Sequence, residues 1–277
     1  MSESTRPLVL KFGGELLEDR SHLATVVSAI GTMAAQRLPL VVIHGGGKEI
    51  DAALKAAGIQ KHQVDGLRIT DEASLGVVVS VLGAVNTRLV AALTAAGVAA
   101  VGLTGADGGS GLSDPAPPHR TVDGRLINLG KVGVPSARSD TKLLMTLLRN
   151  GFVSVVACIG IGGDGQLLNV NADTLASHLA VRLGAQRLVI AGTTRGVLGS
   201  DGKTVPVLDA GAIAELVNDR TATAGMVAKL KACERALVGG VDEVVIVDGR
   251  DGPALEAAAT GAVPATATRL GLKHLVS

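Results

Sequence analysis

The sequence predicts an α/β protein, a three-layer α/β/α sandwich with a central, mainly parallel sheet. Short apolar runs such as Leu8–Phe12 and Leu40–Ile43 alternate along the chain with segments of helical spacing such as Ser21–Gln36. The apolar runs lack polar alternation, which is typical of parallel strands that helices cover on both faces.

The next elements continue this alternation. Gly58 and Gly97 stand where two predicted helices should end. We expect a helix at 48–57, a small hairpin at 59–68, a long helix at 71–96 and a third buried strand at 98–103.

The rest of the chain is less regular. Residues 106–121 are rich in Gly, Pro, Ser and Asp and are expected to form a loop, and residues 125–134 a hairpin that covers a sheet edge. Ser139 is a candidate N-cap for a helix that runs through Arg149. Further strands are expected at 153–159, 187–191 and 243–247, and further helices at 172–183, 209–217 and 226–238. The tail from Thr260 has no clear pattern, and we divide the chain into lobes at residues 1–162 and 163–277 that share one continuous sheet.

Composition disfavours several classes of protein. The net charge is +1, and Phe12 and Phe152 are the only aromatic residues, so nucleic-acid binding is not expected. Apolar stretches such as Val77–Leu82 are too short to span a bilayer, and no signal peptide precedes the first strand. Cys158 and Cys233 lack CxxC spacing, which favours reduced thiols in a cytoplasmic protein.

Glycine motifs follow the first two predicted strands. Gly13-Gly14 follows the first strand, and His44-Gly-Gly-Gly-Lys48 lies between the second strand and a helix. Glycines there let backbone N–H groups face an anion at a helix N-terminus, although an ordinary tight turn is the alternative. Neither of these two glycine motifs reads GxGxxG, which disfavours a Rossmann protein, and GxxxxGK[ST] does not occur in the chain, which disfavours a P-loop protein.

Three basic residues are candidates for binding an anion. Lys11 lies inside an apolar strand, where an ammonium group is costly unless it meets an anion or reaches the sheet edge. Lys229 lies one turn into a predicted helix, where a solvated lysine is the alternative. Arg68 either clamps a carboxylate with two hydrogen bonds or forms a surface ion pair.

Asn169-Val-Asn-Ala-Asp173 adds polar side chains at the start of a helix. Asp173 either caps that helix or orients the lysines. No two histidines have metal-ligand spacing, so no protein-bound metal site is predicted. Lysines and backbone N–H groups, with little capacity for proton transfer, suit a site that moves a phosphoryl group.

Together these residues resemble the amino-acid kinase superfamily, and within it the N-acetylglutamate kinases, from Leu8 to about Gly252. The resemblance rests on the motifs LVLKFGG, VIHGGGK, DGLRITD, AVGLTGADG, SVVACIG, DGQLLNVNADT and GMVAKLKAC. HGGG alone would not separate the members, whereas GLRITD with NVNADT points to this one. The resemblance implies phosphorylation of the γ-carboxylate of N-acetyl-L-glutamate by ATP to N-acetyl-L-glutamyl 5-phosphate, a step of arginine biosynthesis.

The resemblance also implies roles for individual residues. Lys11 and Lys229 would stabilise the transferring phosphoryl group, and Asp173 would hold both lysines. The N-terminal lobe would bind the amino-acid substrate and dimerise. Gly46 and Gly47 would donate N–H groups to the substrate and the γ-phosphate, and Arg68, Asn169 and Asn171 would also bind the substrate. The C-terminal lobe would bind ATP, with Mg²⁺ held mainly through the phosphates. The nucleotide contacts would be Gly13, Gly14, Thr193, Gly196, Val197, Leu198, Thr221, Thr223 and Met226.

Three positions depart from the family pattern. Thr193 stands where the family usually has an aspartate in a Thr-Asp-Val-x-Gly turn, which bears on nucleotide contacts. Lys48 replaces a common proline after the glycines, and Ala224 a common Gly or Asp before Gly225.

The oligomeric state and the activity leave alternatives. Arginine-inhibited relatives carry an N-terminal helix that links dimers into hexamers, whereas about seven residues precede the first strand here. We therefore predict an arginine-insensitive homodimer, joined through the central sheet and the helix at 71–96.

The alternatives to an N-acetylglutamate kinase are a kinase for a related acyl-amino acid of the aminoadipate type or for carbamate, and a non-catalytic amino-acid-sensing module. Retention of Lys11, Asp173 and Lys229 argues against the sensor, and the Thr193 departure argues weakly for it.

Overall fold

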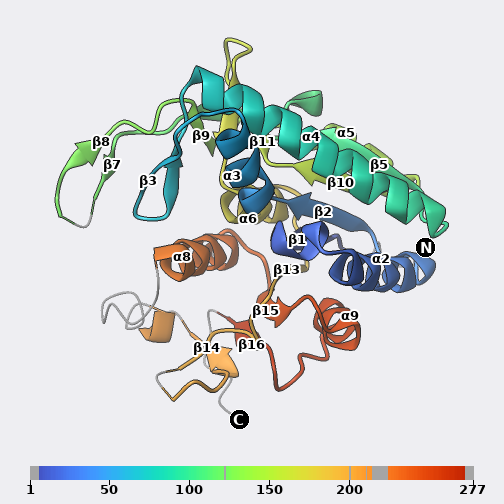
Figure 1. The fold of residues 1–277 in the computed structure, drawn as a ribbon. Helices are drawn as coiled ribbons and strands as arrows, with labels where there is room; N and C mark the ends of the chain where they lie inside the picture. The colour runs from blue at the N-terminus through green and yellow to red at the C-terminus, as the bar shows by residue number, and fades with distance from the viewer. Residues whose placement is uncertain (1–5, 122, 200, 210, 214–223, 272–277) are drawn as a thin grey trace.

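The computed structural model describes residues 6–121, 123–199, 201–209, 211–213 and 224–271 of the chain. Within these residues the central feature is an eight-stranded sheet with the strand order β14-β16-β15-β13-β1-β2-β10-β5 (Figure 1). Its strands are β1 (Leu8–Phe12), β2 (Leu40–His44), β5 (Ala100–Thr104), β10 (Val153–Ala157), β13 (Arg187–Gly192), β14 (Val207–Leu208), β15 (Glu243–Asp248) and β16 (Thr268–Leu270). Every neighbouring pair in it is parallel except β15 and β16. The predicted mainly parallel sheet, which includes strands from both predicted lobes, is confirmed.

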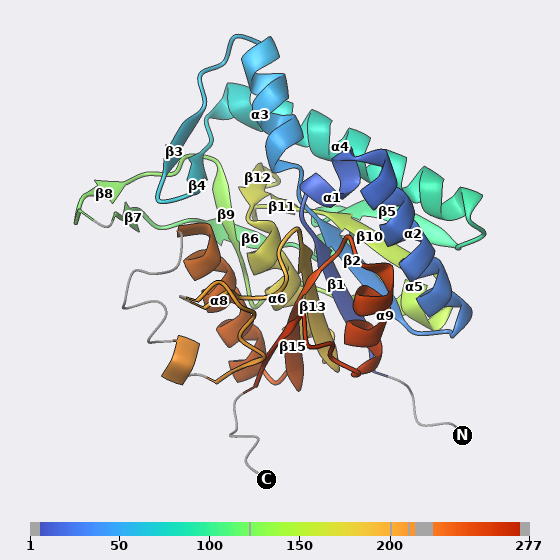
Figure 2. The ribbon, with the colours of Figure 1, turned by 60° about the horizontal axis from the view of Figure 1, so that its bottom comes forward.

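Helices cover both faces of this sheet and complete the three layers (Figures 1 and 2). They are α1 (Glu15–Glu18), α2 (Arg20–Ala35), α3 (Gly47–Ala56), α4 (Glu72–Ala95), α5 (Lys142–Arg149), α6 (Ala172–Arg182), α8 (Ala224–Val238) and α9 (Gly252–Thr260). Helices α2 and α9 pack side by side on one face, and α6 and α8 on the other. Strand residues alternate between the two layers: Leu10 packs on the α2 side, whereas Val9 packs on the α6 side. Lys11, two residues after Val9, therefore points toward α6.

Smaller β elements surround the carboxyl ends of the central strands. A four-stranded sheet contains β6 (Ser113–Pro115), β9 (Val132–Pro135), β11 (Ile159–Ile161) and β12 (Leu167–Val170). The predicted hairpin at 59–68 is present as β3 (His62–Val64) and β4 (Leu67–Ile69), and β7 (His119–Arg120) pairs with β8 (Leu126–Ile127). The two hairpins lie side by side (Figure 1), and the imidazole of His119 lies 2.9 Å from the carboxylate of Asp65.

Several local predictions in the middle of the chain are wrong. The stretch 106–121 is not a loop throughout, since it contains a 3₁₀ helix (Asp107–Gly109), β6 and β7. Residues 125–134 do not form a hairpin, because β8 pairs with β7 while β9 pairs with β6 and β12. The partners of β9 are distant in sequence, so local pattern does not reveal them. The strand predicted at 98–103 is β5, but it is half-exposed rather than buried because it forms the sheet edge.

The predictions for the C-terminal region are incomplete. The helix predicted at 209–217 lies mostly outside the described residues. Helix α9 was not expected, although Asp251 caps it through the Ala254 N–H and Gly261 ends it with a φ of 97°. The tail contains β16, which pairs antiparallel with β15.

The expectation that apolar stretches of this chain are too short to span a bilayer does not hold for helix α4. Among the described helices it alone is long and apolar enough, by length and composition, to cross a membrane. Its buried face, which includes Leu75, Leu82 and Leu89, packs on the sheet and on neighbouring helices. A core helix of a soluble protein satisfies the same criterion.

Ser139 does not cap α5 as predicted. The helix begins at Lys142, whose N–H donates to the carboxylate of Asp140 at 2.8 Å. Ser139 is instead buried, with its Oγ 2.6 Å from Nε2 of His178 on α6. Burial, together with the charge of Arg182, lowers the pKa of His178 to about 4.

We expect the free energy of unfolding to fall as the pH falls from about 6.5 to about 4. Burial also lowers the pKa of His44 to about 4, so in this window the unfolded chain binds protons that the folded chain does not. Denaturant unfolding followed over this pH range measures the slope. His178→Gln should flatten it, and His62→Gln, at an exposed histidine, should not. Equal slopes for the His178 variant and the unsubstituted protein would contradict the prediction.

Candidate functional site

Two lysines and one aspartate from three different elements meet at the carboxyl end of β1. The Nζ atom of Lys11 lies 2.9 Å from Oδ1 of Asp173, in the first turn of α6. The Nζ atom of Lys229, on α8, lies 3.6 Å from the same oxygen. The three side chains are only 10%, 12% and 18% exposed for Lys11, Asp173 and Lys229. The structure thus brings together the three residues that the sequence singled out.

The opposite charges of Lys11 and Asp173 stabilise the ionised form of each residue. Burial raises the pKa of the Asp173 carboxyl, but the charges of Lys11 and Lys229 more than offset burial and lower that pKa below its usual value. Burial lowers the pKa of Lys11, yet Asp173 outweighs it and the net direction is upward. The pKa of Lys229 is lowered, first by burial and then by the charge of Lys11. With both lysines protonated the three residues carry one net positive charge, which favours an incoming anion.

The capping of α6 leaves Asp173 available for the lysines. Asn171 is the N-cap, and its Oδ1 accepts from the N–H of Thr174 at 3.0 Å. The alternative in which Asp173 caps the helix is therefore wrong. Oδ1 of Asp173 receives both ammonium groups as ion pairs and has no well-aligned hydrogen bond. The side-chain oxygen of Asn171 is used by this cap. The predicted contact of Asn171 with substrate stays a prediction.

Two glycine loops close around the cluster. A Cβ at Gly14 would lie 2.9 Å from Cα of Gly46, so the loops after β1 and β2 touch through backbone. A Cβ at Gly45 would lie 3.6 Å from Cβ of Ala172, which precedes Asp173 on α6. The N–H of Gly13 donates to the carbonyl of Ala191 at 3.1 Å. No hydrogen bond within the described part of the chain uses the N–H groups of Gly46 or Gly47, which begin α3.

Arg68 lies on β4 in an ion pair that leaves part of its guanidinium unused. Its Nη2 donates to Oδ1 of Asp51, on α3, at 2.5 Å. Lys61 binds the other oxygen of the same carboxylate. Nη1 of Arg68 is buried and lacks a hydrogen-bond partner among the described residues. A buried, unpaired guanidinium N–H is costly, so this atom is a candidate to bind a ligand oxygen.

Asn169 lies on β12, in the four-stranded sheet near the carboxyl ends of the central strands. Its Nδ2 donates to Oγ1 of the buried Thr70 at 3.0 Å, and its own N–H donates to the carbonyl of Lys131. Thr70 directly follows β4, which carries Arg68, and precedes Asp71, the N-cap of α4. Asn169 and Arg68 are thus linked through the β4–α4 connection.

The predicted nucleotide-binding turn follows β13. A backbone φ of 69° at Gly196 and the Val197 N–H, which donates to Oγ1 of Thr268 at 2.8 Å, hold the turn against β16. The carbonyl of Thr193 accepts from Arg250, whose guanidinium also binds Asp248. Leu198 is exposed at 48%, and Met226 is half-buried on α8 near Lys229. The predicted contacts Thr221 and Thr223 lie outside the described residues.

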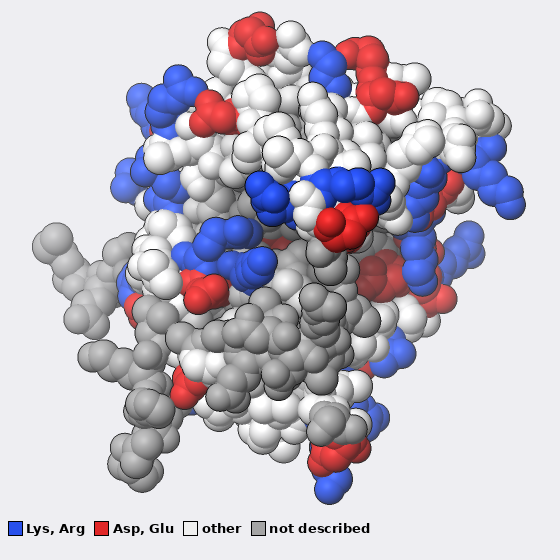
Figure 3. Space-filling model, turned by 90° about the vertical axis from the view of Figure 1, so that its left-hand side faces the viewer, with Lys and Arg blue, Asp and Glu red and all other residues white. Residues whose placement is uncertain are grey.

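Figure 3 shows Lys and Arg side chains, with Asp and Glu among them, near the middle of the face that lies on the left of Figure 1. Among the described residues no group of three or more His, Cys, Asp or Glu side chains could hold a metal ion.

Sequence reasoning missed residues that support the predicted ones. Asp51, which pairs with Arg68, and Thr70, which binds Asn169, lie in other elements, so no local motif identifies them. His44 is buried and hydrogen-bonded to Asn86 of α4. The HGGG motif was the only signal at that position.

Comparisons with known proteins agree with this geometry. The model of the "Amino acid kinase family" matches residues 6–248. An acetylglutamate kinase of Parvibaculum lavamentivorans is 37% identical over 88% of this chain and 82% of its own length. One of Erythrobacter litoralis is 38% identical over 88% of this chain and 83% of its own length.

A solved structure also matches nearly the whole chain. N-acetylglutamate synthase from Neisseria gonorrhoeae, complexed with coenzyme A and N-acetyl-glutamate, superposes with a TM-score of 0.82 at 28% identity. The match covers 98% of this chain and 61% of the synthase chain, so this protein spans about three fifths of that protein's length. The predicted family and fold are confirmed.

We expect Asp173→Asn to lower the free energy of unfolding by about 3–5 kcal/mol, because it leaves the buried Lys11 ammonium without its counter-charge. Asn171→Ala, a matched loss of a neighbouring side chain, should cost only about 1 kcal/mol, the value of an N-cap. Chemical denaturation at neutral pH measures both. The double variant Lys11→Met/Asp173→Asn should recover much of the loss. Equal losses in the two single variants would show that Asp173 is not needed to balance the lysines.

Proposed function

The chain belongs to the amino acid kinase family, and from that premise we propose that it phosphorylates N-acetyl-L-glutamate with ATP. The γ-carboxylate would attack the γ-phosphorus, the bond from that phosphorus to the bridging oxygen would break, and ADP would leave. The product would be N-acetyl-L-glutamyl 5-phosphate, an intermediate of arginine biosynthesis. The observation that carries the proposal is the pair of buried lysines that share one aspartate oxygen beside two glycine loops.

The lysine cluster suits the charge that develops in phosphoryl transfer. Lys11 approaches from β1 and Lys229 from α8, so ammonium groups from two elements would face the transferring group. Asp173 holds both in place before the substrates bind, which avoids reorganisation at the moment of reaction. We propose that the phosphates of ATP complete the compensation of Lys229 and raise its lowered pKa.

The acceptor side requires little proton chemistry. A carboxylate is ionised at neutral pH, so no general base is needed. We propose that the unpaired Nη1 of Arg68 donates to the α-carboxylate of the substrate and that Asn169 binds a second polar group. Gly46 and Gly47 would donate their unused N–H groups, and this alignment would favour in-line transfer.

The nucleotide is proposed to lie along the turn at 193–198 and the start of α8, with the ion Mg²⁺ bound to it. Mg²⁺ takes its oxygen ligands largely from phosphate and water, which fits a site without an acidic cluster in the described residues. When bound, the ion would neutralise phosphate charge. Lys11 and Lys229 would share that task.

The alternatives from the sequence fare less well. A non-catalytic sensing module does not require two buried lysines balanced on one aspartate. The relatives with 37% and 38% identity are named acetylglutamate kinases rather than aminoadipate or carbamate kinases. A cytoplasmic location and a lack of inhibition by arginine stay predictions, as do the separate roles of the two lobes.

ATP-dependent formation of an acyl phosphate, trapped with hydroxylamine, tests the proposal. N-acetyl-L-glutamate should give product, whereas glutamate and N-acetyl-aspartate should give little. Lys11→Ala should reduce kcat by about 10²–10³, in analogy with the loss of one oxyanion donor. Lys48→Ala, at an exposed lysine that lines a surface pocket with Glu18 and Arg88, serves as the control. No product from any of these substrates, with folded protein and Mg²⁺ present, would refute the proposal.

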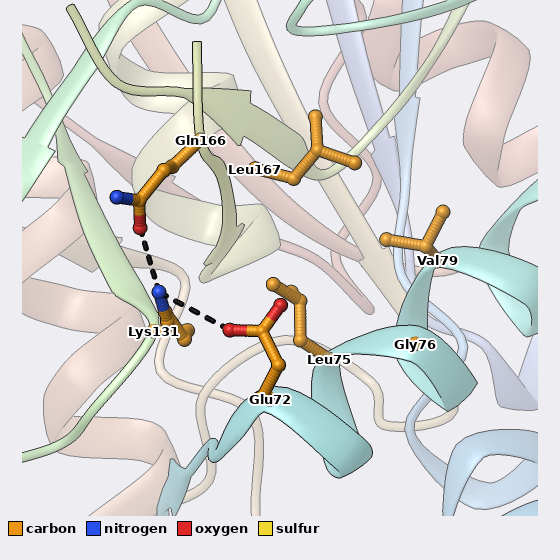
Figure 4. Close-up of a pocket in the computed structure, with 7 residues that line it drawn as sticks. All are labelled: Glu72, Leu75, Gly76, Val79, Lys131, Gln166 and Leu167. Carbon is orange, nitrogen blue, oxygen red and sulfur yellow. Dashed lines mark hydrogen bonds and ion pairs between the residues drawn. The ribbon is translucent and has the colours of Figure 1, made fainter. Parts of the chain in front are cut away.

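We further propose that two copies pair through the exposed face of α4 and the edge strand β5. The exposed face carries small residues on one side of the helix: Gly76, Ser80, Ala84, Thr87 and Ala91. Beside it lies a pocket of about 430 Å³ (Figure 4), whose walls include apolar side chains of Leu75, Val79 and Leu167. In the same view the ammonium of Lys131 bridges Gln166 and Glu72 at the polar rim. The apolar 18-residue segment of α4 is only 33% buried. Its exposed face is therefore well suited to pack against the same helix of a second copy.

Ala84→Arg should convert the dimer into a monomer, because a guanidinium would be buried in the small-residue face without a counter-charge. Light scattering after size exclusion should give twice the 27.7 kDa of one chain for the unsubstituted protein. Ala24→Arg, at an exposed alanine of α2, is the matched control and should remain dimeric. A hexamer, or a dimer unaffected by Ala84→Arg, would contradict this interface.

A further inference from the structure

We propose that His44 is a positioning residue that holds the Gly45–Gly46 peptide so that the N–H of Gly46 faces the transferring phosphoryl group. His44 ends β2 and is fully buried. Its side chain does not touch the lysine cluster directly, and it acts through the backbone of the glycine loop. This inference rests on the proposed function for its kinetic test, and its spectroscopic test is independent of that function.

Two hydrogen bonds define the position of the His44 ring. Nδ1 lies 3.1 Å from the carbonyl oxygen of Gly45, and Nε2 lies 3.1 Å from Nδ2 of Asn86, on α4. The same Nδ2 lies 2.9 Å from the carbonyl oxygen of Val155 and 3.3 Å from that of Leu103. Because both carbonyls can only accept, the amide of Asn86 must present its NH₂ group here.

The orientation of Asn86 selects the tautomer of His44. The NH₂ group donates to Nε2, so Nε2 is the unprotonated acceptor and Nδ1 carries the hydrogen. Nδ1–H then donates to the Gly45 carbonyl. Burial, with a smaller contribution from the charge of Arg88, lowers the pKa of His44 to about 4 and keeps the ring neutral at neutral pH.

The fixed carbonyl determines where the next N–H points. The Gly45–Gly46 peptide is trans, so the C=O of Gly45 and the N–H of Gly46 point in opposite directions. With the carbonyl turned toward His44, this N–H turns away from the ring. It is used by no hydrogen bond among the described residues, and Gly46 lies against Gly14 at the carboxyl end of β1. A glycine loop can flip its peptides easily, and the His44 hydrogen bond opposes that flip.

Two substitutions at His44 separate positioning from packing. His44→Asn places an amide NH₂ near the position of Nδ1 and keeps the donor to Gly45, whereas His44→Gln places its amide near Nε2 and loses that donor. Both remove the imidazole from the same buried site. We expect His44→Gln to lower kcat by about 10- to 100-fold, as a small misplacement of a catalytic donor does, with little change in KM. We expect His44→Asn to retain most of kcat.

Melting temperatures of both variants report the packing cost separately. Equal losses of kcat in the two variants, or none in either, would overturn the proposal. If the unsubstituted protein forms no acyl phosphate, the proposed function fails and the kinetic comparison does not apply.

The tautomer provides the independent test and needs no variant to fold. Two-bond ¹H–¹⁵N spectra of the unsubstituted protein should show one neutral histidine with a protonated Nδ1 and an unprotonated Nε2. Asn86→Ala, which removes the donor to Nε2, should give a mixture of tautomers at that histidine. A protonated Nε2 on His44 in the unsubstituted protein would overturn the inference whatever the enzyme activity.

Discussion

The architecture of the candidate site depends on one carboxylate oxygen, Oδ1 of Asp173, that balances two buried ammonium groups. Without it, Lys11 would be a charge in the middle of an apolar strand, which is strongly unfavourable. With it, β1, α6 and α8 are tied together at the carboxyl end of the sheet. A stable fold and a site with net positive charge therefore come from the same interaction.

The elements around this cluster position polar groups near it and leave several of them available to a ligand. Asn171 caps α6, so Asp173 is available for the lysines. Glycines after β1 and β2 let two backbones touch and leave N–H groups without partners in the described chain. Arg68 binds Asp51 with one nitrogen and keeps the other unpaired. The glycine N–H groups and Nη1 of Arg68 are therefore donors without an acceptor in the described chain, and an anionic substrate can supply one.

Helix α4 contributes to both the core and the periphery. Its buried face carries Asn86, which contacts the end of β2 and the carbonyl of Val155 on β10. Its opposite face carries small residues and is exposed. If two copies pair on that face as proposed, α4 itself lies between the interface and the glycine loop, since Gly46 is near Leu82 and Val85 of this helix. Pairing would then also restrain helix α4, whose Asn86 sets the tautomer of His44.

The sequence alone determined the fold class, the family and the identity of the lysine cluster, because these depend on local features. Apolar runs fix strands, glycines fix the loops, and Lys11, Asp173 and Lys229 belong to recognisable motifs. The tertiary structure decided what pairs with what across long sequence separation. Strand β9 joins β12, Ser139 meets His178 instead of capping α5, and Arg68 meets Asp51. Partners of this kind are chosen by the packing of whole elements, so no local pattern of residues can specify them.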